Sequence, residues 1–276
     1  MPWYMRVQSI TKTTIWVALV VGFIIPLVRP LGLPLNVTEA TTAAFNLVDS
    51  MPAGSIVFQS IGFNPAVDAE TWPQLMALSR HYMEKGLRII FYSTMQEGSM
   101  YAERIKAVAP EYGYEYGSDF AILPFKAGGE ATIAALRDFY SVMTADVYGT
   151  PLSQLPLFGG FSGMQDVDLL VSVTGSEDPV FYVKYIEPEF HTPIIACGTA
   201  PLLPVIGPYV AAKQIQATVI GLSGAAEYEA LAKIPGSATG AMDAQAVGHL
   251  LIVGLVLLSN LGYYFQRRNG RKVEVA

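Results

Sequence analysis

Short, almost uninterrupted apolar runs alternate with stretches of helical period through the middle of the chain. Six apolar runs predict strands, at residues 55–63, 88–94, 120–125, 167–174, 193–197 and 218–222. Their continuous hydrophobicity is typical of parallel strands that are covered on both faces. Helical periods predict helices between them, at residues 70–85, 99–112, 130–144, 178–190 and 225–234. This alternation predicts an α/β fold with a doubly wound, mostly parallel, six-stranded, Rossmann-like sheet.

Local signals mark the ends of the first of these helices. Asp68 is its expected N-cap, and Gly86 is its expected stop. Residues 201–213 form the weakest helical stretch, because three prolines within it disfavour a continuous helix.

Each end of the chain carries an apolar segment without charge, at residues 13–28 and 244–265. A membrane-spanning helix needs about 20 mainly apolar residues. The second segment meets this length. The first is shorter, but the flanking side chains of Lys12 and Arg29 can reach the headgroups. We therefore predict one transmembrane helix at each end of the chain, which gives an N-terminal anchor in residues 1–34, an α/β domain in residues 35–243, and a C-terminal helix with a basic tail in residues 244–276.

A cleaved signal peptide is the alternative for the first segment, with Arg6 and Lys12 as its basic region. Pro26 and Arg29 follow the apolar run and argue against cleavage. Both alternatives stay open, and both send the middle of the chain across a membrane.

Composition and charge add an orientation. The chain is 52% hydrophobic and 14% charged, and its mean hydropathy is +0.38. Residues 35–243 contain 10 basic and 22 acidic side chains, whereas both ends are basic. Lys and Arg near the ends of spanning helices stay in the cytoplasm. The basic residues after residue 265 therefore predict a two-pass protein of the cell membrane, with both termini cytoplasmic and the α/β domain extracytoplasmic. The acidic domain also argues against binding to nucleic acid.

The single cysteine, Cys197, excludes an intramolecular disulfide and a metal site of several cysteines. A cysteine nucleophile usually needs a histidine as its base. His81 and His191 are expected at the opposite edge of the sheet, and His249 lies in the second apolar segment. We therefore expect Cys197 to be a buried structural residue, and we expect neither a metal nor a cofactor.

Candidate ligand-binding residues follow the ends of the predicted strands, because open parallel sheets bind ligands beyond the carboxyl ends of their strands. Helix capping explains part of this polar texture. The predicted site residues are Ser93, Thr94, Glu97, Lys126, Gly128, Gly129, Glu130, Thr174, Ser176, Thr199, Ser223 and Glu227.

The segment from Lys126 to Glu130 is the sharpest local feature of this edge. Its two glycines allow backbone N–H groups to point at a ligand, and a helix N-terminus favours an anion. Glu130 in the same turn would repel a phosphate, and the segment matches neither the phosphate loop nor the dinucleotide fingerprint. A small anionic ligand and an ordinary tight turn both remain open here.

Three features predict association into a homo-oligomer or a larger membrane complex. The first is the long apolar loop of residues 145–165, which is either a contact surface or a flap folded onto its own domain. The second is the proline-containing stretch of residues 201–213. The third is Asn260, whose amide could form a hydrogen bond between membrane helices.

Four segments resemble a group of prokaryotic membrane-anchored proteins that carry a Rossmann-like domain between terminal transmembrane helices. These segments are residues 126–130 (KAGGE), 146–151 (DVYGTP), 224–229 (GAAEYE) and 240–245 (GAMDAQ). The resemblance covers most of residues 50–270. It implies the same anchored architecture and supplies no activity and no catalytic residues.

We accordingly expect a non-catalytic, membrane-anchored module that binds a small ligand or a partner subunit. The alternative is a carboxylate-dependent hydrolase that acts at the carboxyl edge of the sheet, with Glu97, Glu130, Glu227 and Glu229 as the available acids. A pocket that holds two carboxylates within about 5–9 Å of each other would favour the enzyme. A shallow, apolar edge would favour the binding module.

Overall fold

The computed structural model describes residues 2 and 6 and residues 9–234 and 236–268. The chain divides into two compact units, one formed by Met1–Pro34 with Thr239–Ala276 and the other by Leu35–Ala238. We call them the helical hairpin and the α/β domain. Arg271 and Lys272, which contribute to the predicted basic tail, lie outside the described residues.

The hairpin contains the helices α2 (Lys12–Val28) and α12 (Ser237–Arg268). Within the described residues, α12 is the one helix that is long and apolar enough to cross a membrane. With 17 residues, α2 is shorter than the usual spanning helix of about 20. The structure therefore supports the predicted C-terminal span and does not establish the N-terminal one.

Glycines bring the two helices of the hairpin into close contact. A Cβ atom on Gly22 would lie 2.6 Å from Leu251 Cδ1, and one on Gly248 would lie 2.5 Å from the ring of Phe23. The paired positions rise along α2 as they fall along α12, so the helices are antiparallel. Close backbone approach of this kind stabilises helix pairs in lipid, where no hydrophobic force acts between helices.

A buried carboxylate ties the chain that follows α2 to the first turns of α12. Asp243 is 3% exposed. Its two oxygens accept the backbone N–H groups of Leu31, Gly32 and Leu33 at 2.6, 2.9 and 3.1 Å. Gly32 has a positive φ of 66°, which a glycine adopts without strain.

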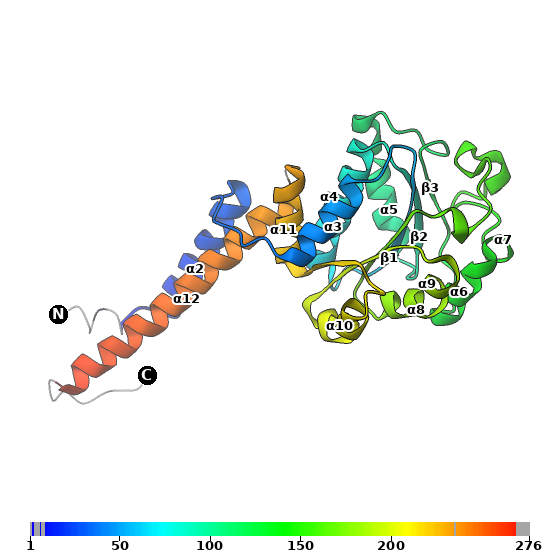
Figure 1. Cartoon of the computed structure of the whole chain (residues 1–276). Coiled ribbons are helices and arrows are strands. Elements are labelled where there is room, and N and C mark those ends of the chain that lie inside the picture. The colour runs from blue at the N-terminus through cyan, green and yellow to red at the C-terminus, as the bar shows by residue number, and fades with distance from the viewer. Residues whose placement is uncertain (1, 3–5, 7–8, 235, 269–276) are drawn as a thin grey trace. The chain divides into compact units, whose positions relative to one another are not determined.

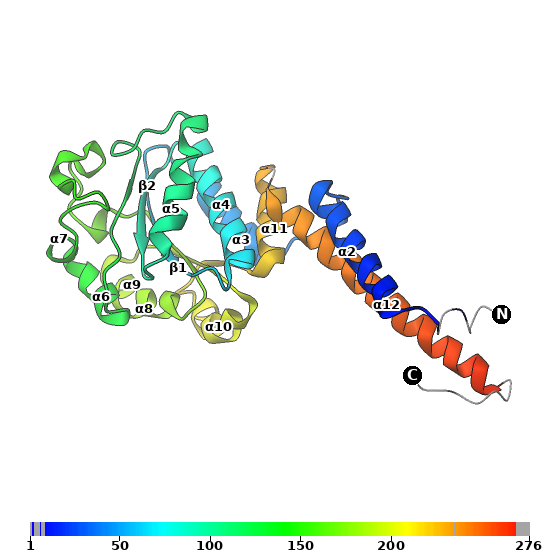
Figure 2. The same cartoon turned by 180° about the vertical axis from the view of Figure 1, so that it is seen from behind.

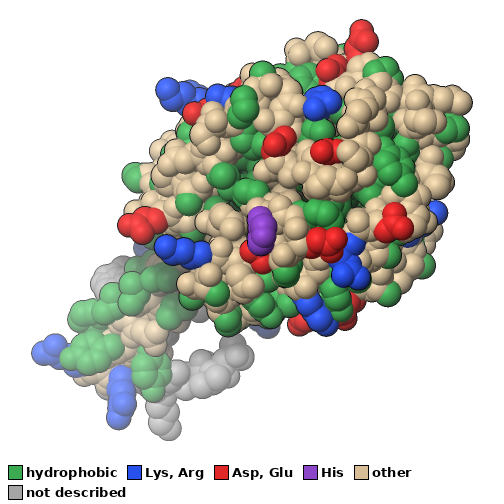
Figure 3. Space-filling view, turned by 45° about the vertical axis from the view of Figure 1, so that its right-hand side comes forward, with side chains coloured by type: hydrophobic (Ala, Val, Ile, Leu, Met, Phe, Trp, Pro, Cys, Tyr) green, Lys and Arg blue, Asp and Glu red, His purple; other side chains and the backbone are tan. Residues whose placement is uncertain are grey.

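The outer surface of the hairpin is apolar. Figure 3 shows hydrophobic side chains over the part of the hairpin that is in view. Trp16, Val20 and Ile24 of α2 and Leu250 and Leu257 of α12 are among the exposed large hydrophobic residues. A surface of this composition suits a lipid environment better than water.

The α/β domain is built on six parallel strands in the order β3-β2-β1-β4-β5-β6 (Figure 1). The strands are β1 (Ile56–Gly62), β2 (Arg88–Ser93), β3 (Phe120–Ile122), β4 (Leu169–Thr174), β5 (Ile194–Gly198) and β6 (Ala217–Ile220). All six predicted strands are therefore present, and all pairings are parallel. The order reverses between β1 and β4, as in dinucleotide-binding folds.

Helices cover both faces of the sheet (Figures 1 and 2). One face carries α3 (Glu39–Asp49), α4 (Asp68–Glu84), α5 (Gly98–Lys106) and α11 (Gly221–Ala232). The other face carries α6 (Glu130–Ala135), α7 (Phe139–Val142), α8 (Asp178–Tyr185), α9 (Glu187–Phe190) and α10 (Leu203–Ala211). Helices on both faces of a parallel sheet confirm the predicted α/β class.

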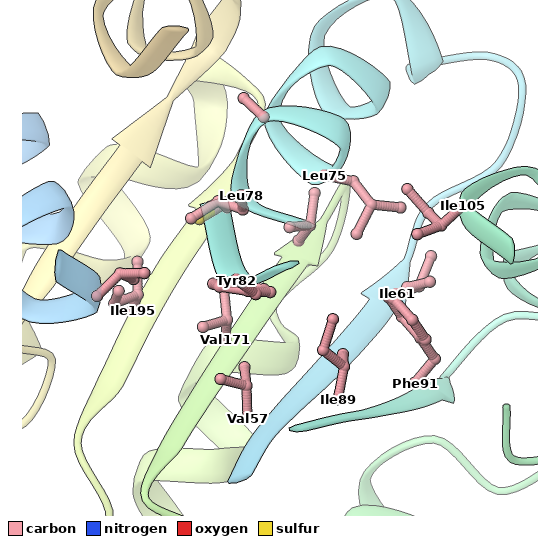
Figure 4. Close-up of a cluster of buried hydrophobic side chains, with 14 of the residues drawn as sticks. Val57, Ile61, Leu75, Leu78, Tyr82, Ile89, Phe91, Ile105, Val171 and Ile195 are labelled. Atoms are coloured by element: carbon pink, nitrogen blue, oxygen red, sulfur yellow. The ribbon is translucent and has the colours of Figure 1, made fainter. Parts of the chain in front are cut away.

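Alternate residues of each strand enter two separate cores. Figure 4 shows Val57, Ile89 and Val171 on the face that packs against Leu78 and Tyr82 of α4. Their strand neighbours Phe58, Ile90 and Leu170 belong to the core on the opposite face. Because both faces are buried, the strands are apolar at nearly every position, as predicted from the continuous hydrophobic runs.

Several helices differ from the predictions. Residues 39–49 form α3, which the hydrophobic pattern did not indicate, with Thr38 as the N-cap. The predicted helix at residues 130–144 breaks into α6, a 3-10 turn at Leu136–Asp138, and α7. Asp68 is not the N-cap of α4. Val67 occupies that position, and Asp68 Oδ2 instead accepts the hydroxyl of Tyr101 at 3.2 Å.

The apolar loop of residues 145–165 is folded onto its own domain. It forms three short 3-10 turns, and its large side chains, including Leu152, Leu157, Phe158 and Phe161, are buried in the second core. The alternative of a flap is thus confirmed. Since these side chains are covered within the chain, the loop no longer supports the predicted association.

Candidate functional site

Polar side chains from two strand ends meet where the strand order reverses. Thr94 follows β2, while Thr174 ends β4 and is followed by Ser176 and then Asp178 in the first turn of α8. Thr94, Thr174 and Asp178 lie close to Gly62, the last residue of β1. This crevice between β1 and β4 is where doubly wound sheets bind their ligands.

Asp178 is the centre of this hydroxyl–carboxylate cluster. It is 7% exposed. Its Oδ2 accepts the hydroxyl of Thr94 at 2.5 Å and lies 3.2 Å from the hydroxyl of Thr174, and its Oδ1 accepts the hydroxyl of Ser176 at 2.8 Å. The Thr174 hydroxyl also lies 2.8 Å from the carbonyl oxygen of Gly62. Thr94 and Ser176 therefore donate to one buried carboxylate, and Thr174, whose shorter hydrogen bond goes to Gly62, lies beside it.

The cluster lies at the crevice beside which dinucleotide-binding folds hold their ligand. A Cβ atom on Gly62 would lie 2.1 Å from Asp178 Oδ2. A buried carboxylate such as that of Asp178 opposes a second anion at the same place. The β1–β4 crevice is thus filled by the protein's own negative charge, which disfavours a phosphate ligand at this point.

The turn before α6 contains the two predicted glycines. Its carboxylate, Glu130, forms hydrogen bonds within the protein. Gly128 and Gly129 have positive φ values of 136° and 51°. Glu130 accepts from Lys184 Nζ and from the Tyr185 hydroxyl, both at 2.7 Å, and so links α6 to α8. The hydrogen bond from Lys184 is the main cause that lowers the pKa of Glu130. The ionised form of this carboxyl group is therefore stabilised, which does not suit a proton donor.

A cavity of about 290 Å³ lies beyond the carboxyl end of β6. Its walls come from the start of α3, the turn before α10, the end of β6 and the first half of α11. The lining residues are Thr38, Ala40, Thr41, Ala200, Leu203, Thr218, Ile220, Gly221, Ser223, Gly224 and Glu227. The walls are mainly apolar, and Glu227 is the charged residue among them.

Glu227 is held so that one oxygen is anchored. The residue is 5% exposed. Its Oε2 accepts the backbone N–H of Thr38 at 3.0 Å and the Thr38 hydroxyl at 2.8 Å. Within the described part of the chain, these are the hydrogen bonds that Glu227 forms, which leaves Oε1 for an occupant of the cavity. A buried carboxylate is costly unless its oxygens find donors.

The structure thus divides the predicted site residues among separate places. Ser93, Thr94, Thr174 and Ser176 lie at the β1–β4 crevice, where Ser93 is buried and its hydroxyl donates to the Met95 carbonyl. Ser223 and Glu227 line the β6 cavity, and the buried Thr199 directly precedes Ala200 of its wall. Glu97, Lys126, Gly128 and Gly129 are exposed and belong to neither group.

Three residues that shape these places were not among the predicted site residues. Gly62 and Asp178 form the crevice, and Thr38 anchors Glu227. Gly62 lies near the end of the first predicted strand and Asp178 follows Ser176 by two residues, so the sequence pattern could have indicated both as site residues. Nothing in the local pattern connected Thr38 with residue 227.

The buried histidine and cysteine do not form a catalytic pair. His81 Nδ1 lies 2.8 Å from the Tyr228 hydroxyl, its Nε2 lies 3.5 Å from Asp49, and its ring stacks on Phe45. Burial lowers the pKa of His81. Cys197 is fully buried, which raises the pKa of its thiol and keeps it protonated. The prediction of a buried structural cysteine is confirmed.

Comparison with known proteins does not assign a family. No protein-family model matches the chain, and no curated protein matches it. Among solved structures, the chain is similar to one described as the crystal structure of AibC, with 11% sequence identity and a TM-score of 0.32. The match covers 87% of this chain and 55% of the other, so the chain spans little more than half of that structure's length. A likeness of this degree carries no functional argument.

Proposed function

We propose that the chain is a membrane-anchored binding module that holds a small molecule in the cavity at the end of β6, without catalysing a reaction on it. The observation that carries this proposal is the buried Glu227, which has one oxygen anchored by Thr38 and the other left to a mainly apolar cavity. The cavity also lies at the carboxyl edge of the sheet, where ligands of parallel α/β folds bind.

The lining of the cavity restricts the chemical class of the ligand. An ionised carboxylate accepts hydrogen bonds and cannot donate them. A matching ligand therefore has an apolar body and one donor group, an ammonium or a hydroxyl. The volume of about 290 Å³ is at the lower end of small-molecule sites. A small anionic ligand at Lys126, Gly128 and Gly129 would be a separate site, because Glu227 repels an anion from this cavity.

The acids of the hydrolase alternative do not form a catalytic pair. Three of them form hydrogen bonds or an ion pair with other parts of the chain. Glu130 pairs with Lys184, and Glu227 holds Thr38. Glu229 accepts the backbone N–H of Ala238 at 2.9 Å. Glu227 is the single acid of the predicted set that lines its cavity, and the carboxylate of Glu70 lies near the lining residue Gly221, so the acids named for a hydrolase are not paired there. These observations favour binding over catalysis.

For the anchor, we propose that α2 and α12 both cross the bilayer. Their antiparallel contacts, the apolar outer surface and the clasp at Asp243 support a hairpin that inserts as a unit. The side chains of Lys12 and Arg29 can extend the reach of the shorter α2. The basic residues beyond α12 favour cytoplasmic termini and an extracytoplasmic domain.

Association with a second copy or with a partner subunit remains a prediction. Asn260, the residue expected to bond between helices, donates its amide to the Val256 carbonyl of its own helix at 2.9 Å. Its side chain is exposed on the hairpin, where a second membrane helix could still reach it.

Replacing Glu227 by glutamine is expected to weaken binding of a cationic ligand at least tenfold, because a hydrogen bond to a charged group contributes about 1.5–3 kcal/mol. The test is native mass spectrometry of the full chain in mild detergent, against small apolar amines, alcohols and the corresponding acids. Glu39→Gln is the matched control, since Glu39 is exposed and does not line the cavity. Ser223→Phe should abolish binding by filling the cavity. Unchanged affinity in both Glu227→Gln and Ser223→Phe would place the ligand elsewhere.

Reporter fusions are expected to show a cytoplasmic C-terminus and an extracytoplasmic domain. A reporter that is active only in the cytoplasm should work at residue 276, and one that is active only outside should work when inserted near residue 100. The positive charge beyond α12 is the physical reason. A fusion at residue 276 that is active only outside would contradict the topology.

A further inference from the structure

Helix α10 and the turn before it are apolar yet poorly buried. No charged side chain occurs from Ala200 to Ala211. Ile206 is buried in α10 and Leu202 in the preceding turn, whereas Leu203 is 48% and Val205 is 36% exposed. Figures 1 and 2 show α10 at the periphery of the α/β domain. In water, a helix that is apolar on all sides is normally buried in a core.

We propose that the exposed face of α10 docks onto the surface of the lipid bilayer. The face comprises Leu203, Pro204, Val205 and Pro208, all exposed. An apolar helix without charge can settle at the boundary between headgroups and acyl chains, where the area removed from water determines its affinity.

The short connections between the α/β domain and the hairpin favour a bilayer as the surface that covers α10. Residues 35–37 separate the hairpin from Thr38, and residues 233–236 separate α11 from α12. Four extended residues span at most about 14 Å. Thr38 and Leu203 line the same cavity, so α10 begins near the residue to which this short connection leads.

The local charge also fits a lipid surface. The α/β domain is acidic, but residues 191–226 contain no acidic side chain, and Lys213 is their single lysine or arginine. The α10 segment therefore brings no negative charge of its own to anionic headgroups. Because the anchor already confines the domain to the membrane, a weak intrinsic affinity is sufficient for docking.

Site-directed fluorescence in the full chain, reconstituted into liposomes, tests this docking. Single cysteines at Val205 or Leu203 carry bimane, and the fully buried Cys197 stays in place as an unlabelled background. The lipids are brominated either near the headgroup or at mid-chain. Leu257→Cys on α12 reports the anchor, and Tyr148→Cys, also exposed, reports a domain surface outside α10.

Labels at positions 203 and 205 are expected to lose roughly half of their fluorescence with lipids brominated near the headgroup, and less with bromine at mid-chain. The label at position 257 should show the reverse order, and the label at position 148 should be unaffected. Quenching at 257 without quenching at 203 and 205 overturns the docking and leaves the anchor intact. No quenching at any position overturns both. Protection of 203 and 205 from aqueous iodide without quenching by brominated lipid would mean that protein covers α10, which also overturns the proposal.

Discussion

Replacing Gly62 by alanine is expected to lower the free energy of unfolding of the α/β domain by about 2–4 kcal/mol. The new methyl group would lie 2.1 Å from Asp178 Oδ2 and 2.6 Å from the hydroxyl oxygens of Thr94 and Thr174. Such distances force the carboxylate out of its place. Both the packing at the end of β1 and the hydrogen bonds of the cluster are then lost.

A double-mutant cycle tests this mechanism. Asp178→Ala removes the atom that the new methyl group meets first, so Gly62→Ala should cost at least about 1 kcal/mol less in that background. The measurement is denaturant unfolding of the full chain in mild detergent. Gly207→Ala is the control, because a Cβ atom there has no neighbour within 4 Å. It lies inside α10 and should stabilise by up to about 1 kcal/mol. Strictly additive costs in the cycle would contradict a direct collision.

Replacing Asp243 by alanine is expected to destabilise the helical hairpin by about 3 kcal/mol or more, because hydrogen bonds to a charged group contribute about 1.5–3 kcal/mol each and are not fully additive. Three backbone N–H groups, of Leu31, Gly32 and Leu33, would lose their acceptor. Asp243→Asn keeps one acceptor oxygen without the charge, so its effect should be intermediate. The helices α2 and α12 should then separate more readily at the end near Asp243.

Distances between nitroxide labels measure this separation. Leu27→Cys and Leu250→Cys place one label on each helix at exposed positions in the half of the hairpin nearer Asp243, and the full chain is reconstituted into liposomes. The wild-type hairpin should show a narrow distance distribution, and Asp243→Ala should broaden it toward longer distances. Gln245→Ala, which alters an exposed residue of the same helix, should leave it unchanged. An unchanged distribution in Asp243→Ala would show that the glycine contacts hold the helices without the clasp.

The strands were predictable because their signal is local. A parallel strand that is covered on both faces must be apolar at almost every position, and Ile89 to Tyr92 or Ile194 to Cys197 show this directly. Helix α3 was missed because its short, mixed segment has no strong apolar period. It forms by packing on β6 and α11, which is a tertiary cause.

The sequence predicted which polar residues lie at the carboxyl edge of the sheet, but not which of them contact one another. Parallel strands bring their carboxyl ends together, so Thr94, Thr174 and Ser176 could be assigned to it from the sequence. That Thr94 meets Asp178, 84 positions further on, depends on β1 lying between β2 and β4. The contact of Thr38 with Glu227 likewise depends on α3 covering the last strand.

The sequence by itself determined the α/β class, the six strands, the apolar C-terminal helix and the buried cysteine. Each of these follows from the periodicity or length of one continuous segment, which the local order of residues encodes. Only the tertiary structure decided that the 145–165 loop folds inward, that Asp178 fills the crevice, and that Glu227 stands in a cavity. These outcomes depend on strand order and on contacts between residues far apart in the chain, which hydrophobic periodicity does not specify.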